Sequence, residues 1–80
     1  MENMFMEFKV TFAKAVRIER VRQDVTQEEL AEMVGITPQY LCKIENVRRT
    51  ASVEMYVRIA GALGLRLELG GSGSDESNGQ

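Results

Sequence analysis

Apolar residues along most of the chain recur at a spacing of roughly three to four positions, which is typical of helices that pack on a core. In the segment Thr11–Gln23, Phe12, Ala13 and Val16 form one stripe, and basic residues lie opposite it. The same spacing returns in three later segments, which are separated by turn and capping residues. We therefore expect a helix over 11–23, followed by three shorter helices.

Capping residues set the bounds of the later helices. Thr26 is a good N-cap, and Glu29 completes a capping box with it. Thr37 caps the next helix, and Pro38 stands at its first position, where the missing N–H costs nothing. Ser52 caps the last helix. We expect helices from 27 to 33 or 34, from 38 to about 46, and from 53 to about 63. The inward positions of the last helix should be Val53, Tyr56, Ile59, Ala60 and Leu63.

Two short stretches alternate with period two, and this pattern predicts strands. Met6–Val10 places its Met, Phe and Val on one face, and Leu65–Leu69 places three leucines on one face. Because a lone strand needs a partner, we expect the two to pair antiparallel, with Lys9 near Glu68. The pairing can lie within one chain or between two chains. We favour pairing between chains, at a dimer interface.

The helices over 27–34 and 38–46 carry a helix-turn-helix pattern. Counted from Gln27, a small residue, Ala31, is fifth, where two helices approach closely. Gly35 is ninth, where the turn requires a positive φ that Gly adopts freely. Apolar residues also fill the positions that pack such a pair, namely Leu30, Val34, Ile36, Leu41 and Ile44. All of these positions agree, so we interpret the segment as a helix-turn-helix.

The stretch TQEELAEMVGITPQYLCKIENVRR, extended by SVEMYVRIAGALGL, resembles the lambda-repressor/Cro (XRE-type) helix-turn-helix family. The resemblance covers roughly Phe12–Leu65 and implies a bundle of about four or five helices that binds double-stranded DNA as a dimer. The sequence departs from the family at Asp24 and Val47, where Gly is usual, and at Ala51, where Pro is common. No fifth helix follows Gly64, and the predicted strand takes its place.

These observations predict an all-α fold, a small four-helix domain over 1–69 with short terminal β-strands paired at a dimer interface. The segment 70–80 is Gly/Ser-rich and acidic, so we expect a disordered tail there. The resemblance also implies a structural ion pair between Arg20 and Glu45.

The outward face of the helix over 38–46 is the candidate site. Its apolar positions point inward, which leaves Gln39, Tyr40, Lys43 and Asn46 outward. The second helix of a helix-turn-helix enters the major groove, where Gln suits adenine and Lys suits guanine. The family's pattern implies base reading by Gln39 and Lys43, and by Pro38 through apolar contact alone. Tyr40 either touches a base or stacks on a neighbour.

Phosphate contacts are expected around the same helix. The resemblance places Gln27, at a helix N-terminus, on a phosphate. Asn46, Arg48 and Arg49 follow the reading helix and would hold the DNA backbone electrostatically, and Thr37 at its N-cap belongs to the same set. The alternative for all of these residues is an ordinary solvated helix face.

Composition narrows the function further. The chain has 80 residues, a net charge of −2, one cysteine and no histidine. Between positions 8 and 69, however, ten basic residues face eight acidic ones. No His base, His-containing metal site or internal disulfide is possible, so we expect no enzyme, cofactor or metal. We interpret Cys42 as a small packing residue and the five methionines as residues that fill the core.

No run of about 18 apolar residues or secretory signal is present, so we expect no membrane span and a cytoplasmic location. We therefore predict a sequence-specific DNA-binding transcriptional regulator, a repressor that binds a palindromic operator as a homodimer. The alternative is a protein-interaction module on the same fold, such as the antitoxin of a toxin–antitoxin pair. The predicted terminal strand and the acidic tail suit that alternative, whose partner would be a toxin.

Overall fold

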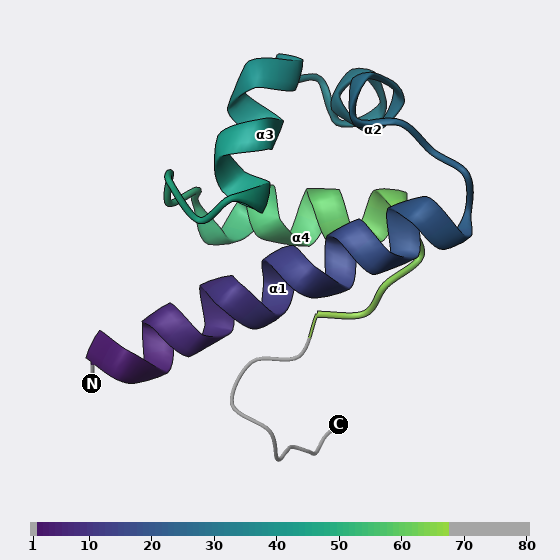
Figure 1. The fold of residues 1–80 in the computed structure, drawn as a ribbon. Coiled ribbons are helices and arrows are strands. Elements are labelled where there is room, and N and C mark those ends of the chain that lie inside the picture. The colour runs from purple at the N-terminus through teal and green to yellow at the C-terminus, as the bar shows by residue number, and fades with distance from the viewer. Residues whose placement is uncertain (1, 68–80) are drawn as a thin grey trace, which may run out of the picture.

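The computed structural model describes residues 2–67, which form four α-helices joined by short turns (Figure 1). The helices are α1 (Glu2–Arg22), α2 (Gln27–Val34), α3 (Pro38–Glu45) and α4 (Val53–Ala62). In Figure 1, α2 and α3 stand above α1 and α4. The predicted all-α, four-helix fold is confirmed. The predicted tail over 70–80 lies outside the described residues, so the domain bounds of 1–69 and 70–80 stay a prediction.

The strand predicted at Met6–Val10 is wrong, because this stretch is the second and third turns of α1, a helix of 21 residues. Aromatic packing explains the outcome. The Phe8 ring lies 5.8 Å from the Phe12 ring and 5.3 Å from the Tyr56 ring, measured between centroids. Residues four apart lie about 6 Å apart along a helix but about 13 Å apart along a strand, so the helix brings both phenylalanine rings to Tyr56. Lys9, expected beside Glu68, instead donates to the Thr50 hydroxyl at 3.0 Å.

The second predicted strand, Leu65–Leu69, is also wrong where it can be checked. Residues 65–67 are not in a strand, and Leu65 and Leu67 pack against the helical core instead. Positions 68 and 69 lie outside the described residues. Without strands at 6–10 and 65–67, the predicted pairing of the chain ends at a dimer interface has no support. The terminal segments add apolar cover to the helical bundle rather than a sheet.

The core lies where the four helices meet. The predicted stripe of Phe12, Ala13 and Val16 is buried, and Leu30 and Ile59 are fully enclosed. Two expectations fail at the rim. Val53, at the first position of α4, is 59% exposed because it precedes the part of the helix that reaches the core. Among the four methionines that the structure describes, Met4, Met6 and Met33 are exposed and only Met55 packs against the core.

A residue with positive φ lies one or two positions beyond the last residue of each of the four described helices. These residues are Asp24 (61°), Gly35 (89°), Val47 (59°) and Gly64 (76°). Each is followed by an amide that donates back across the helix end, as in the bond from Arg48 N–H to the Lys43 carbonyl at 2.8 Å. This is the Schellman arrangement, which glycine favours. Asp24 and Val47, the two departures from the family's glycines, therefore adopt the conformation that a glycine would.

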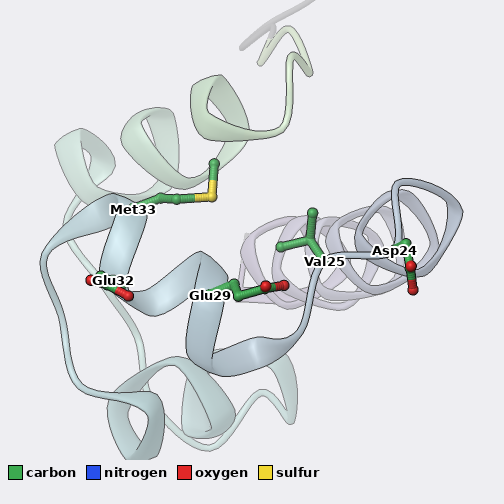
Figure 2. Close-up of a pocket in the computed structure, with 5 residues that line it drawn as sticks. All are labelled: Asp24, Val25, Glu29, Glu32 and Met33. Atoms are coloured by element: carbon green, nitrogen blue, oxygen red, sulfur yellow. The ribbon is translucent and has the colours of Figure 1, made fainter.

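The link between α1 and α2 is fixed by the predicted capping box. The Thr26 hydroxyl accepts from Glu29 N–H at 3.0 Å, and the Glu29 carboxylate accepts from Thr26 N–H at 2.9 Å. Figure 2 shows Glu29 pointing back toward this link, at a hollow that Asp24, Val25, Glu32 and Met33 also line. Within residues 2–67 no group of three potential ligands is placed to hold a metal ion, and no helix is long and apolar enough to span a bilayer.

Candidate nucleic-acid interface

α3 is built so that one side is fixed in the core and the other faces solvent. Thr37 caps it, with its hydroxyl accepting from Tyr40 N–H at 3.1 Å, and Pro38 takes the first position. Leu41 is fully buried and Ile44 is 3% exposed. These two anchors set the rotation of the helix about its axis. The exposed side is therefore held at a defined angle, as a surface that reads a groove requires.

The exposed side of α3 brings four of the predicted site residues together. Gln39, Lys43, Asn46 and Arg48 line one shallow hollow, with Cys42 among them. All four are exposed, and they present amide, ammonium and guanidinium donors. No carboxylate lines this hollow, whereas three line the one in Figure 2. Of the two, only the α3 hollow suits a polyanion.

Tyr40, expected either to touch a base or to stack on a neighbour, contacts a neighbour in the free protein. It is half-buried against the core, and the Arg49 guanidinium carbon lies 5.8 Å from the centre of its ring. This is a cation–π contact, so Tyr40 and Arg49 support each other on the surface. Pro38 is also half-buried. The exposed polar groups at this end of α3 are therefore the Thr37 hydroxyl, the Gln39 amide and the Arg49 guanidinium.

Asn46 and Thr37 are already engaged by α3 itself. The Asn46 amide donates to the Cys42 carbonyl at 2.8 Å and lies 3.3 Å from its sulfur. The Thr37 hydroxyl accepts the capping bond, but its own proton remains available to a phosphate oxygen. Cys42 is half-buried and packs at the helix edge. Asn46 thus closes the end of α3 with both of its amide donor bonds, and a phosphate contact from this amide would replace the weaker bond to sulfur.

A buried network ties α3 to α1 and α2. The Glu45 side chain is 1% exposed, and its carboxylate accepts from Arg20 Nε at 3.1 Å and Nη2 at 3.2 Å. Gln27 Nε2 adds a third bond at 3.0 Å. The Arg20–Glu45 pair is therefore confirmed. Gln27 was predicted to contact a phosphate. Its side-chain amide donates one hydrogen to Glu45, and its backbone N–H at the N-terminus of α2 remains available to an anion.

Two arginines that sequence reasoning missed support the ends of the motif's helices. Arg17 donates to the Glu45 carbonyl at 2.8 Å, and Arg58 donates to the Val34 carbonyl at 2.8 Å. Both bonds satisfy carbonyls at a helix C-terminus, where cations are favoured. Arg17 precedes Arg20 by three positions, so a shared helix face was a signal for it. Nothing local to Arg58 indicated its partner.

Comparisons with known proteins also identify a helix-turn-helix in this part of the chain. A family model described as helix-turn-helix matches residues 16–69, which is more than half of the chain. The chain belongs to the XRE-type helix-turn-helix family. The chain is also 45% identical over 49 residues to an uncharacterized HTH-type transcriptional regulator of Methanothermobacter thermautotrophicus (strain Delta H). That alignment covers 61% of this chain and 71% of the relative. No solved structure matches significantly.

Family membership confirms the predicted resemblance and the assignment to DNA-binding transcription regulators. The matched residues contain α2, the turn at Gly35, α3 and every predicted site residue from Gln27 to Arg49. They also contain Asp24 and Val47, the two positive-φ positions at which this XRE-type chain lacks a glycine. The roles of the individual side chains on DNA remain predictions.

Proposed function

We propose that this protein is a sequence-specific transcriptional repressor that reads operator DNA with α3. The observation that carries the proposal is the hollow on α3, where Gln39, Lys43 and Arg48 present exposed donors and no carboxylate intervenes. The opposite side of the same helix is anchored by Leu41 and Ile44 in the core. A rigid helix with donors on its free side matches the major groove in shape and in charge.

Base reading falls to Gln39 and Lys43. Glutamine can bond both N6 and N7 of adenine, and lysine can donate to O6 and N7 of guanine. The two residues are four apart, so they lie about 6 Å apart along the helix axis. Base pairs are stacked about 3.4 Å apart, so the two side chains would meet base pairs roughly one or two steps apart. Pro38 and Tyr40 offer apolar contact beside them.

Phosphate contacts come from the residues around this reading face. Arg48 and Arg49 are exposed immediately after α3 and carry positive charge. Thr37 keeps its hydroxyl hydrogen as a donor, and Gln27 offers the backbone N–H of a helix N-terminus. Asn46 can donate to a phosphate by giving up its bond to the Cys42 sulfur. Glu28 and Glu29 in the first turn of α2 oppose an anion there. The arginines therefore supply most of the electrostatic attraction.

Repression would follow from two copies occupying a palindromic operator. Two recognition helices of a dimer enter successive major grooves about 34 Å apart, and a protein bound there blocks a promoter. The antitoxin alternative drew on a terminal strand, which residues 65–67 do not form, and on the acidic tail, which lies outside the described residues. The repressor is therefore the one function proposed.

Selection from a pool of random duplexes tests this function. The full chain should enrich one sequence with two-fold symmetry, and its affinity should fall linearly on logarithmic axes as salt rises, because phosphate contacts release counterions. Arg66→Ala is the matched control, since it removes an exposed charge at the other end of the chain. Failure to enrich any sequence, with binding equally weak on all duplexes, would contradict the proposal.

A further inference from the structure

One side of α1, next to its core-facing stripe, carries a heptad-like seam. Met4, Phe8, Thr11, Ala15 and Ile18 are spaced alternately four and three apart, which places them on one line along a helix, as in a coiled coil. Met4 is 72% exposed and Ile18 is 65% exposed. Thr11 and Ala15 are also exposed, and Phe8 is half-buried. We refer to these five residues as the α1 seam.

The seam continues into an apolar hollow. Phe8, Thr11 and Ala15 form one wall, and residues at and beyond the end of α4, among them Leu65 and Leu67, form the other. Figure 1 shows the chain after α4 turning back beneath α1. A continuous apolar surface of this kind on a small domain usually marks an interaction site. The α1 contacts with α3, made by Arg17 and Arg20, do not use the seam residues.

Charges beside the seam indicate what covers it. Glu7 and Lys14 precede Phe8 and Ala15 by one residue, so they occupy the same flank one heptad apart. Both are exposed, and within residues 2–67 neither forms an ion pair. If two copies of α1 run antiparallel about a two-fold axis, Glu7 of each copy faces Lys14 of the other, because such an interface is self-complementary. A parallel pair would set like charges at the same level.

The sizes of the seam residues favour the same arrangement. The first two residues of the α1 seam, Met4 and Phe8, have large side chains. The next two, Thr11 and Ala15, have small ones, and Ile18 is large again. In the antiparallel register that sets Glu7 against Lys14, Phe8 of one copy meets the small Ala15 of the other, Thr11 meets Thr11, and Met4 meets Ile18. Close packing of this kind fills space without voids. Parallel packing would set large against large and small against small.

We propose that the α1 seam is a dimer interface, in which it packs antiparallel against the α1 seam of a second copy of this chain. The proposal rests on the dimer invoked in the proposed function and gives that dimer a location. It replaces the strand pairing predicted from the sequence, and it leaves the exposed face of α3 uncovered.

Sedimentation equilibrium of the full chain, without DNA, tests the seam. Ile18→Glu should raise the dimer dissociation constant about tenfold or more, because it places a charge in an apolar contact. Since Ile18 is largely exposed in the monomer, the melting temperature of the dilute, monomeric variant should stay at the parent value. Val53→Glu is the matched control, because Val53 is an exposed β-branched residue on a different helix, α4. This variant should leave the dissociation constant unchanged.

A charge exchange tests the direction of the two helices. Glu7→Lys and Lys14→Glu should each weaken the dimer, and the double variant should restore it. The seam is overturned if the parent remains monomeric at the highest workable concentration, or if Ile18→Glu dimerises like Val53→Glu. The antiparallel arrangement is overturned if the double variant is no tighter than the single ones.

Binding to a duplex that holds one half-site separates this proposal from the proposed function. Ile18→Glu should bind such a half-site as the parent does, because α3 is unchanged. If even the parent shows no preference for the selected half-site, the reading role of α3 fails, and the sedimentation results still decide the seam.

Discussion

Arg20 holds the Glu45 carboxylate with two nitrogens, Nε at 3.1 Å from Oε2 and Nη2 at 3.2 Å from Oε1. The arginine side chain is 14% exposed and the glutamate side chain 1% exposed, so water barely reaches the pair. It joins α1 to the last residue of α3. The orientation of the reading helix therefore depends on an ion pair that lies behind it.

Arg20→Met should destabilise the fold by about 3–5 kcal/mol, because it leaves a buried carboxylate without its charge partner. Urea unfolding measures the change. Arg22→Met is the control, since it breaks the exposed pair of Arg22 with Glu19 and should shift the midpoint little. If the two variants unfold alike, the buried pair does not hold α1 to α3.

Val47→Gly should stabilise the protein. Val47 has φ of 59°, and a left-handed conformation costs a residue with a Cβ about 1–2 kcal/mol. Part of that gain is offset because Val47 is half-buried and glycine is freer in the unfolded chain. We expect a net gain of about 1 kcal/mol in the free energy of unfolding. Val47→Ala is the control: it removes the same methyl groups, retains Cβ and should bring no gain.

Gly35→Ala should act in the opposite direction. Gly35 has φ of 89°, and a Cβ there would lie 3.7 Å from the Arg58 guanidinium, so space is adequate and strain alone decides. A loss of about 1–2 kcal/mol is expected. Gly61→Ala in α4, where a Cβ meets nothing within 4 Å, should be neutral or stabilising. Equal effects of the two substitutions would show that the turn tolerates a side chain.

Glu19 should titrate far below an ordinary carboxyl. Hydrogen bonds from Arg22 and then from Gln23 lower the pKa of Glu19 from 4.5 to about 2. Because the folded value is the lower one, the ionised carboxylate stabilises the fold above pH 4.5, and this contribution is lost as the pH falls toward 2. NMR titration of the side-chain carbon should give that midpoint. In Arg22→Met the midpoint should move back toward 4.5, and an unchanged midpoint would exclude Arg22 as the main cause.

Short-range signals predicted much of the fold, and contacts between distant residues decided the rest. The capping box of Thr26 and Glu29 depends on neighbours three apart, so the sequence was sufficient for it. The alternation at Met6–Val10 is also compatible with a helix, and the packing of Phe8 on Tyr56 favours the helix. These two residues are far apart in the sequence. Local pattern cannot reveal their contact, and the strand prediction failed for this reason.

The candidate site was likewise predicted from the sequence only in part. The exposure of Gln39 and Lys43 followed from the inward positions of Leu41 and Ile44, which helical spacing determines. The partners of the other side chains did not follow. Whether Tyr40 stacks under Arg49 depends on side-chain rotamers, and these are set by packing that the sequence does not display.

The base-reading role of α3 gives the final prediction. On the selected operator, Gln39→Ala and Lys43→Ala should each cost about 1–3 kcal/mol of binding free energy and relax the preference at one base pair. Both residues are exposed, so folding should not change. Arg48→Ala should instead weaken binding to all sequences alike and reduce the salt slope by about 1, because a phosphate contact carries no sequence information. Titration of each variant against the operator and against single-base variants of it distinguishes the two patterns. If Gln39→Ala and Lys43→Ala retain the parent's affinity and sequence preference, α3 does not read the bases, and the donors around its hollow are only a solvated helix face.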